Sequence, residues 1–405
     1  MPGVVIIGAG QAAYQCAESL RHEQYDGAIT LIGDEAYPPY QRPPLSKSYL
    51  LGDVDKQRLL FRTEAYYQEH QIDLRLNTRV IEIHRSEHRL SLDSGEQLTY
   101  DKLVIATGAS VRRLPVPGAD AEGVCYLKTI DDIDHIEAQL KQSERVVVIG
   151  AGFIGLEFAA VASKLGKQVE VIEAMDRVMG RVVHPLISEY FSTLHQQHGV
   201  TIHCGTAVTE IEAKQGRVKR VLCADDKSFA ADLVVVGIGV IANTELAEQC
   251  GLVCGGGVVV DEDGRSSDPN IFAAGDCTIY RHPFMQQPIR LESVQNAADQ
   301  AKTVAATLAG QHKPYQTVPW FWSDQFDAKL QMVGLSMDCD SSVLRGNQDE
   351  GKFSIFHFRG DKLRAIDSVN KPADHMMGRK LLAAGISPSI EQAADTDFAL
   401  KSLLG

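Results

Sequence analysis

Two glycine-rich stretches carry the residues whose types and spacing point most directly to chemistry. Residues 8–13 read Gly-x-Gly-x-x-Ala, and residues 150–155 read Gly-x-Gly-x-x-Gly. In this pattern the first glycine allows a tight turn, the second lets backbone approach a diphosphate, and the last small residue lets a helix pack on its strand. A diphosphate would sit at the helix N-terminus, where free N–H groups and the helix dipole favour negative charge. The chain therefore carries two candidate dinucleotide sites.

Each motif follows a predicted buried strand. Residues 4–7 and 146–149 are apolar and mostly β-branched, which is typical of parallel strands covered on both faces. After the first motif the spacing predicts a helix from Gln11 to Arg21. Such a motif also occurs in ordinary tight turns, but its place between a strand and a helix favours nucleotide binding.

A second strand with an acid at its end completes each unit. Residues 29–32 lead to Asp34 and Glu35, and residues 169–172 lead to Glu173. An acid at this distance from the glycines holds a ribose hydroxyl. Because the whole unit occurs twice, the sequence predicts two dinucleotide-binding units, with one cofactor held permanently and the other exchanging.

The remaining segments extend these two units. Residues 72–89 alternate in polarity and are followed by 90–98, so we expect an antiparallel excursion there, and residues 201–222 predict another β excursion. Apolar strands at 103–108 and 231–239 close the two units in matching fashion. The other expected elements are a helix at 130–140, a strand that ends in Gly275-Asp276, a helix at 293–308, strands at 330–335, 352–358 and 363–369, and a helix at 375–384.

These elements predict an α/β protein of three domains. The first comprises residues 1–112 and 241–315, because the chain should return to the first unit, and the second comprises residues 113–240. Both are expected to be Rossmann-like dinucleotide-binding domains. Residues 316–405 have a different pattern, with several strands followed by a helix, which predicts a small α+β domain.

Composition excludes several classes of partner. The 405 residues carry a formal net charge of −13, which argues against nucleic acid. An acidic protein partner would have to meet a local basic patch. No apolar run approaches the length of a membrane span, and no signal peptide is evident, so we expect a soluble, cytoplasmic protein. Nothing in the sequence demands more than a monomer.

The eight cysteines are scattered and form no metal-type Cys-x-x-Cys. We expect them to be reduced and mostly structural. Cys250 and Cys254 are the closest pair, but they lack His or Cys companions, so a redox disulfide is the less favoured alternative.

A proline-rich loop, residues 37–47, carries Arg42 and Lys47. Its prolines exclude a strand and delay any helix until Pro44, after which residues 45–51 can be helical. The two cations would then project from a rigid loop. The plainer interpretation is a solvated linker.

Further short motifs follow in a characteristic order: Arg42–Lys47, Ala106-Thr107-Gly108, Gly155-Leu156-Glu157, Gly275-Asp276, Glu292-Ser293-Val294 and Trp320–Gln325. With the glycine motifs, they resemble those of the FAD-dependent pyridine nucleotide-disulfide oxidoreductases, which have the glutathione-reductase-like fold. Within these, the chain is similar to ferredoxin reductases of the putidaredoxin reductase type, which lack the redox disulfide and feed bacterial P450 and Rieske-type oxygenase systems. The resemblance covers the whole chain.

The resemblance implies that the first unit holds FAD and the second holds NAD(H). Val80 would reach the adenine side, Asp276 the ribityl–diphosphate region and Val294 the isoalloxazine. The cofactor-binding residues so implied are Gly8, Gly10, Ala12, Asp34, Glu35, Arg42, Lys47, Val80, Ala106, Thr107, Gly108, Lys128, Gly150, Gly152, Ile154, Gly155, Glu173, Gly239, Asp276, Val294 and Trp322.

Glu173 bears on the choice of pyridine nucleotide. A carboxylate there bonds the adenosine ribose hydroxyls and repels a 2′-phosphate, which favours NADH. Arg177 lies four residues later and could meet that phosphate. We favour NADH because the acid occupies the tip of the strand.

NADH donates two electrons as hydride, whereas an iron–sulfur protein accepts one at a time, and a flavin can exchange both ways. The resemblance implies that Lys47 lies near flavin N5 and pairs with Glu157, orienting and balancing charge rather than transferring protons. Trp322 would cover a flavin edge. Arg290 and Lys302 are candidates to dock an acidic [2Fe-2S] ferredoxin. The plainer interpretations are a surface acid for Glu157, core packing for Trp322 and solvated surface cations.

Other activities remain open. Disulfide reductases of this fold carry a Cys-x-x-x-x-Cys pair where this chain has Arg42–Lys47, so disulfide reduction is disfavoured, as is single-cysteine peroxide or oxygen reduction. Reduction of rubredoxin or of monodehydroascorbate stays possible, because those acceptors also take single electrons. A non-catalytic NADH-sensing flavoprotein of the apoptosis-inducing-factor type is the alternative from a different class.

Overall fold

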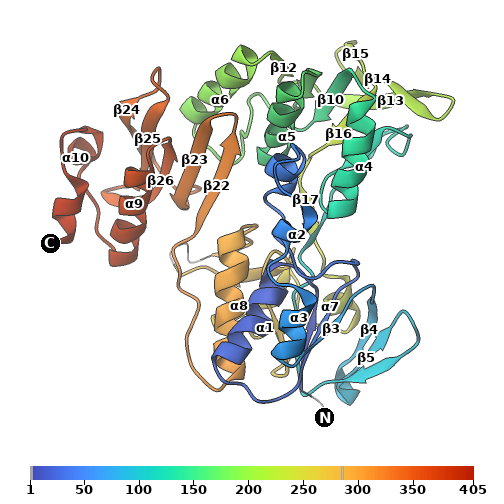
Figure 1. Ribbon diagram of the computed structural model, residues 1–405. Helices are drawn as coiled ribbons and strands as arrows, with labels where there is room; N and C mark the ends of the chain where they lie inside the picture. The colour runs from blue at the N-terminus through green and yellow to red at the C-terminus, as the bar shows by residue number, and fades with distance from the viewer. Residues whose placement is uncertain (1–2, 284, 286) are drawn as a thin grey trace. The chain divides into compact units, whose positions relative to one another are not determined.

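The computed structural model describes residues 3–283, 285 and 287–405 (Figure 1). It divides into two compact units. Unit 1 comprises Met1–Arg42, Asp55–Ser110 and Val240–Thr317, and unit 2 comprises Pro43–Val54, Val111–Gly239 and Val318–Gly405. The proline-rich loop is thus shared, with Arg42 in unit 1 and Lys47 in unit 2.

A five-stranded parallel sheet forms the centre of unit 1, in the order β19-β7-β1-β2-β3. All four residues of the central strand β1 (Val4–Ile7) are buried. The outer strand β19 brings the chain back to this sheet from far along the sequence. The other strands are β2 (Ile29–Ile32), β3 (Ile72–Arg75), β7 (Lys102–Ile105) and β19 (Ile271–Ala273).

Two helices of unit 1 pack against each other beside this sheet: α1 (Gln11–His22) and α8 (Val294–Leu308). Their contact faces are rich in alanine, which lets the backbones approach closely. Ala13 and Ala17 of α1 share a buried core with Ala301 and Val304 of α8. The core fixes the first turn of each helix, where ligand-facing groups are expected.

The rest of unit 1 consists of short elements around this core. Its smaller sheets are β4-β5-β6, β18-β20-β21 and the crossing pair β8-β17. Their bounds and those of the short helices are β4 (Val80–His84), β5 (Arg89–Leu92), β6 (Gln97–Thr99), β8 (Ala109–Val111), β17 (Val240–Ala242), β18 (Val258–Val260), β20 (Thr278–Arg281), β21 (Pro288–Ile289), α2 (Lys56–Leu59), α3 (Glu64–Glu69), α7 (Glu245–Gln249) and the single turn η2 (Arg85–Glu87).

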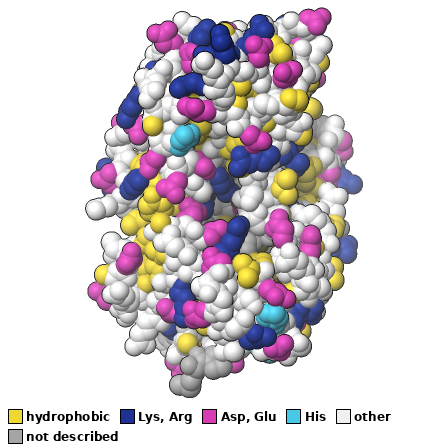
Figure 2. Space-filling model, turned by 90° about the vertical axis from the view of Figure 1, so that its right-hand side faces the viewer, with side chains coloured by type: hydrophobic (Ala, Val, Ile, Leu, Met, Phe, Trp, Pro, Cys, Tyr) yellow, Lys and Arg dark blue, Asp and Glu magenta, His cyan; other side chains and the backbone are white. Residues whose placement is uncertain are grey.

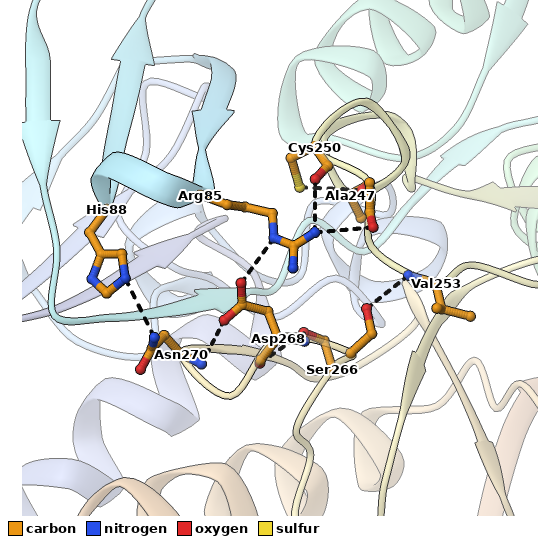
Figure 3. A network of polar contacts seen from close by, with 10 residues as sticks. Arg85, His88, Ala247, Cys250, Val253, Ser266, Asp268 and Asn270 are labelled. Atoms are coloured by element: carbon orange, nitrogen blue, oxygen red, sulfur yellow. Dashed lines mark hydrogen bonds and ion pairs between the residues drawn. The ribbon is translucent and has the colours of Figure 1, made fainter.

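A polar network ties the β4–β5 hairpin to the segments after α7 (Figure 3). Arg85 Nε donates to Asp268 Oδ2 at 2.9 Å, and Arg85 Nη1 donates to the carbonyls of Cys250 and Gly251 at 3.1 Å each. A cation is favourable there, because the C-terminal end of a helix carries partial negative charge. This network is structural: Arg85 binds the backbone carbonyl of Cys250, and the Cys250 sulfur donates to the Ala247 carbonyl.

A second parallel sheet, in the order β12-β11-β10-β16-β9, forms the nucleotide-motif part of unit 2. Its elements are β9 (Val124–Tyr126), β10 (Arg145–Ile149), β11 (Gln168–Ile172), β12 (Val200–His203), β16 (Leu233–Val236), α4 (Ile130–Lys141), α5 (Phe153–Lys164), α6 (Pro185–Gln197) and the short helical segment η1 (Leu45–Tyr49). An antiparallel sheet of β13 (Val208–Lys214), β14 (Arg217–Cys223) and β15 (Ser228–Ala230) packs beside it.

Two strand predictions are right in part. Residues 72–98 and 201–222 do contain the antiparallel strands β4-β5-β6 and β13-β14, but β3 and β12 at their starts are the parallel edge strands of the two main sheets. Each has only its first residue buried. An edge strand is half exposed, so its residues alternate in polarity like those of an antiparallel strand.

The C-terminal part of unit 2 is an antiparallel sheet with helices, as the α+β prediction required. The strand order is β22-β23-β26-β25-β24. Helix α9 covers it through Leu381, which shares a buried core with Phe356 and Ile366. The elements are β22 (Trp320–Gln325), β23 (Ala328–Gly334), β24 (Ser341–Asn347), β25 (Lys352–Arg359), β26 (Lys362–Val369), α9 (Pro372–Ala384), α10 (Ile390–Ala394) and η3 (Leu400–Leu404).

Charged side chains are mixed on the surface. On the face that Figure 2 shows, basic and acidic side chains lie among one another without a broad region of one sign. Within the described residues, no helix has the length and apolar character needed to cross a membrane.

Candidate functional site

The first candidate site is the turn from β1 into α1, residues Gly8–Ala13, here called the first cradle. Gly8 has φ +117°, and a β-carbon there would lie 2.2 Å from the carbonyl oxygen of Ala106, so only glycine fits. Gly10 is the N-cap of α1 and makes no side-chain cap hydrogen bond. A β-carbon at Gly10 would meet no atom within 4 Å. The space next to the helix N-terminus is therefore open.

The second cradle, Gly150–Gly155, has the same construction in unit 2. Gly150 has φ +103°, and β-carbons at Gly150 and Gly155 would lie 2.6 Å from the Gly237 carbonyl oxygen and 2.1 Å from the Gly150 carbonyl oxygen, respectively. Gly152 is the N-cap of α5, again without a side-chain cap and with nothing within 4 Å of a β-carbon.

Both cradles fit a dinucleotide diphosphate. Several other helix N-termini are capped by a side chain, as by Thr129 on α4 and Ser293 on α8. The N-termini of α1 and α5 instead present backbone N–H groups and helix-dipole charge to a space that glycine keeps clear. FAD and NAD(P)H both carry the anion that such a space accepts.

Glu173 lies at the edge of the second cradle. Its Oε2 accepts from the backbone N–H of Ala151 at 2.7 Å, and its Oε1 accepts from that of Met175 at 2.8 Å. The carboxylate is thereby fixed against the glycine turn. Because a carboxylate has about four lone-pair positions, it can still accept from ribose hydroxyls.

Arg177 is held away from this role. Its Nη1 donates to the Val183 carbonyl at 2.8 Å and to Ser188 Oγ at 2.7 Å, and its Nη2 donates to the Gly180 carbonyl at 2.6 Å. Both terminal nitrogens therefore have local acceptors. A 2′-phosphate would have to compete with these bonds.

The acids at the edge of the first cradle behave differently. Asp34 is 63% exposed and lies 4.0 Å from Arg79. Glu35 is held by Arg42 at 2.5 Å and by the Tyr40 hydroxyl at 2.6 Å. Although burial lowers it, the pKa of the Arg42 guanidinium is raised overall by Tyr40, Glu35 and Asp276. Arg42 and Asp276 therefore influence each other within unit 1.

The strand that closes the first cradle ends in Ala106-Thr107-Gly108. Thr107 Oγ1 donates to the Asn243 carbonyl at 2.9 Å, and Asn243 Nδ2 donates to the Thr107 carbonyl at 2.8 Å. Asn243 was not predicted, and its bonds span 136 residues, so no local sequence pattern could have found it. It fixes the backbone beside the cradle.

A third segment, Gly275-Asp276, also reaches the first cradle. Gly275 has φ +87°, and a β-carbon there would lie 3.1 Å from Ala12 Cβ. Its N–H donates to Gln300 Oε1 on α8 at 2.9 Å. Asp276 is half-buried, and so is Val294, the first residue of α8.

Lys47 and Glu157 form an ion pair in unit 2, the pair that the resemblance implied. Lys47 Nζ lies 2.5 Å from Glu157 Oε2, and Glu157 is only 5% exposed. Lys47 breaks the helical segment η1, with φ −133° and ψ −108°. Ser46 Oγ donates to the same oxygen at 2.7 Å, and Ser323 Oγ donates to Glu157 Oε1 at 2.7 Å. The two serines were not predicted.

The other candidate residues are found in both units. Val80 is buried at the start of β4, and Trp322 is half-buried beside Trp320 on β22. Lys128 lies before α4 and donates its N–H to Asp132. Ile154 is 45% exposed in the first turn of α5, and Gly239, with φ +102°, has nothing within 4 Å of a β-carbon.

The predicted docking cations already have acidic neighbours. Arg290 lies 2.6 Å from Glu292, and Lys302 lies 3.0 Å from Asp299. All eight cysteines are unpaired, and Cys250 donates its S–H to the Ala247 carbonyl.

Comparison with known proteins agrees with this geometry over the whole chain. Residues 2–301 match the pyridine nucleotide-disulphide oxidoreductase family, and residues 320–404 match the reductase C-terminal family. Rhodocoxin reductase of Rhodococcus erythropolis is 49% identical over 98% of this chain and 93% of its own.

Two solved structures have the same fold throughout. The ferredoxin reductase for the CYP199A2 system from Rhodopseudomonas palustris is 48% identical, with a TM-score of 0.97 and 99% of each chain covered. The covalent putidaredoxin reductase–putidaredoxin complex matches with 38% identity and a TM-score of 0.97, covering 100% of this chain and 98% of the other. The chain therefore belongs to the pyridine nucleotide-disulphide oxidoreductase family, among the ferredoxin reductases of the putidaredoxin reductase type.

Proposed function

We propose that this chain is a flavoenzyme that takes hydride from NADH and passes the electrons one at a time to a [2Fe-2S] ferredoxin of a P450 or Rieske-type oxygenase system. The observation that carries the proposal is the pair of cradles, each a helix N-terminus that glycine keeps open, in a chain of the ferredoxin reductase type. When bound, FAD supplies the conversion of a two-electron donor into one-electron steps.

Within the proposal, the first cradle holds FAD. Gly8, Gly10 and Ala12 bind the diphosphate, and Asp34 or Glu35 binds the adenosine ribose. The remaining FAD contacts are assigned to Arg42, Lys47, Val80, Ala106, Thr107, Gly108, Lys128, Asp276, Val294 and Trp322. The second cradle, with Gly150, Gly152, Ile154, Gly155 and Gly239, holds the nicotinamide dinucleotide.

Lys47 and Glu157 act as an electrostatic pair. Glu157 is buried and accepts from three side chains, so its position is rigid, and it fixes the Lys47 ammonium in turn. A preorganised cation beside a group that gains negative charge lowers the barrier, because no reorganisation is needed at the moment of reaction. Neither residue has to move a proton.

NADH is the proposed donor rather than NADPH. Two observations support this: the Glu173 carboxylate is fixed against the second cradle, and Arg177 is engaged by neighbouring acceptors. A second negative group at the 2′-position would face the carboxylate without a free cation from Arg177. We also propose that the enzyme works in the cytoplasm.

The proposed acceptor is a small iron–sulfur protein, with Arg290 and Lys302 as its docking residues. Rubredoxin or monodehydroascorbate reduction, and a sensor role without turnover, are the alternatives. The segment where disulfide reductases carry their cysteine pair is Arg42–Lys47 here, and it contains no sulfur.

Anaerobic stopped-flow absorbance tests the proposal. The FAD-loaded protein is mixed with NADH or NADPH, and the reduced protein is then mixed with plant-type and adrenodoxin-like [2Fe-2S] ferredoxins and with rubredoxin. We expect bleaching by NADH at lower concentration than by NADPH, and reoxidation by a [2Fe-2S] ferredoxin within milliseconds. A long-lived charge-transfer complex that no carrier reoxidises would favour the sensor, and protein that stays colourless with FAD would end the proposal.

A further inference from the structure

A buried series of side chains leads away from Glu157 in unit 2. Ser323 on β22 donates to Glu157 Oε1 at 2.7 Å. Gln325, on the same strand, donates from Nε2 to Ser323 Oγ at 3.2 Å, and its Oε1 lies 2.9 Å from His195 Nε2 on α6. Ser323, Gln325 and His195 are 0%, 1% and 0% exposed. The series therefore runs entirely through protein interior.

The hydrogen bonds in this series run in one direction. Because an amide oxygen only accepts, His195 Nε2 carries the proton that Gln325 Oε1 receives. The amide nitrogen of Gln325 only donates, so it occupies a lone pair of Ser323 Oγ. The single hydroxyl hydrogen of Ser323 is then directed to Glu157. Each donor in the series points toward the carboxylate.

His195 suits the far end of such a series. Burial lowers the pKa of His195 to about 4, despite its hydrogen bond with Gln325, so the ring is neutral at neutral pH. Its Nδ1 is buried and has no hydrogen-bond partner among the residues that the structure describes. A hydrogen on Nδ1 would find no acceptor there, whereas a hydrogen on Nε2 is accepted by Gln325, so the tautomer with its hydrogen on Nε2 is favoured.

The two oxygens of Glu157 depend on different donors. Oε2 accepts from Lys47 and Ser46, whereas Ser323 supplies the donor to Oε1. A buried carboxylate oxygen that loses its donor is costly, so the carboxylate would rotate to recover one. Rotation would displace Oε2 from Lys47.

We propose that Ser323, oriented by Gln325 and His195, is a positioning residue for hydride transfer, because it holds the Glu157 carboxylate in the orientation that fixes the Lys47 ammonium. This inference rests on the proposed function of Lys47 and Glu157. It gives the antiparallel C-terminal sheet a part in the chemistry of the nucleotide-binding core of unit 2.

The test is Ser323→Ala in the FAD-loaded enzyme, measured by the limiting rate of flavin reduction under anaerobic NADH. We expect the rate to fall about tenfold, the size of one hydrogen bond to a charged group. FAD content and the apparent NADH dissociation constant should not change, because the Ser323 side chain bonds to Glu157 and Gln325, which lie outside both cradles. Ser323→Thr, which restores a hydroxyl, should recover most of the rate.

Ser354→Ala is the matched control. Ser354 is also 0% exposed, lies in the same antiparallel sheet, and donates to the buried carboxylate of Asp374 at 2.9 Å. This variant loses a comparable bond but should keep the wild-type reduction rate. Equal slowing in both variants would show a general packing effect and overturn the inference.

A double-mutant cycle separates this inference from the proposed function. If Ser323 acts through Glu157, Ser323→Ala should cause no further slowing in an enzyme that carries Glu157→Gln. Additive slowing would overturn the inference. If Lys47→Ala and Glu157→Gln slow reduction but Ser323→Ala does not, the inference alone fails. If Lys47→Ala and Glu157→Gln both reduce at the wild-type rate, the proposed role of the pair fails as well.

Discussion

The two cradles share their glycine geometry but differ in what surrounds them. In unit 1 the outer strand β19 and helix α8 come from residues 271–308, and Gly275-Asp276 between them reaches Ala12. In unit 2 the equivalent outer position is taken by β9, which precedes the cradle in the sequence. The first cradle therefore has a segment from far along the sequence beside it, whereas the second cradle is contacted by Met179, which donates to the Ala151 carbonyl, and by Phe321, which packs on Phe153.

The acids that we propose to bind ribose at the two cradles differ as well. Glu173 is bound to the backbone of its own cradle through Ala151, whereas Asp34 is exposed. The comparison shows how one glycine motif can be adapted to a cofactor that stays bound and to one that exchanges. Under the proposed function, the return of residues 271–308 to the first cradle suits a cofactor that stays, and the fixed carboxylate of Glu173 suits a cofactor that exchanges.

Blocking each cradle should give the largest effects. Gly10→Val and Gly152→Val place a side chain where nothing lies within 4 Å, at positions with φ −92° and −78° that valine can adopt. We expect Gly10→Val to purify without FAD, and Gly152→Val to stay yellow but resist bleaching by NADH. Absorbance spectra and NADH titrations measure both outcomes.

Each of these glycine variants is the control for the other. Far-ultraviolet circular dichroism should match wild type in both, because replacing glycine at a helix N-cap costs about 1 kcal/mol or less. Loss of FAD from both variants would contradict the assignment of one cofactor to each cradle.

Replacing the two cations of the proline-rich loop should give the next largest effects, one on flavin reduction and the other on FAD retention. Lys47→Ala should slow flavin reduction by about tenfold to hundredfold while FAD is retained, because it removes a preorganised charge. Arg42→Ala removes the partner of Glu35 and should let FAD dissociate more readily, with little change in the reduction rate of the loaded fraction. Unchanged reduction kinetics in Lys47→Ala would remove Lys47 from the mechanism.

Replacing the two acids proposed to bind ribose should change cofactor binding by less than the variants above. Glu173→Ala should weaken NADH binding about tenfold, since hydrogen bonds to a charged group are lost. It should also reduce the preference for NADH over NADPH. Asp34→Ala should leave FAD content near wild type, because its side chain is exposed and 4.0 Å from Arg79. Titration with both dinucleotides checks the first variant. An equal loss of affinity for NADH and NADPH would argue against the ribose assignment.

The smallest effect concerns an aspartate at the N-terminal end of each parallel sheet, away from the cradle. Asp232 precedes β16 in unit 2 and is bonded to Arg145 at 2.7 Å, whereas Asp101, at the same place in unit 1, stands opposite Gly3 rather than an arginine. The Arg145 guanidinium lowers the pKa of Asp232 to about 2. Because the side chains of Arg145 and Asp232 are 47% and 26% exposed, solvent screening limits the stabilisation to about 1 kcal/mol.

A folded-state pKa below the ordinary value gives the sign of the effect. The stabilisation by Asp232 is complete above about pH 4 and is lost as the pH falls through about 2. Asp232→Asn should lower the midpoint of thermal unfolding at pH 7, and the difference should shrink below pH 4. Asp101→Asn should change it less at either pH. A difference between wild type and Asp232→Asn that stays constant down to pH 2 would contradict this.

Local patterns account for much of the fold and less of the site. Glycine spacing and buried apolar runs predicted β1, α1, β10 and α5, because a strand, a tight turn and a helix are each specified within a few residues. The parallel pairing of β3 and β12 was missed, because their alternation reports half-burial rather than the direction of the neighbouring strand.

The site shows the same limit. The pairing of Lys47 with Glu157 followed from resemblance, and the structure joins them across 110 residues. Ser323 lies in the Trp320–Gln325 motif and Asn243 in none, but no role was predicted for either, since a serine or asparagine reads as an ordinary polar residue until its distant partner is known. Long-range hydrogen bonds complete both the surroundings of Glu157 and the backbone beside the first cradle.

The position of β19 has a consequence for synthesis on the ribosome. The parallel sheet of unit 2 is complete once residue 236 has left the exit tunnel, but that of unit 1 lacks its outer strand until Ala273 and its helix partner until Leu308. We therefore expect a nascent chain to finish its second nucleotide fold before its first. With FAD in the first cradle, as proposed, flavin loading becomes a late event, and chains that stop early would be released without colour.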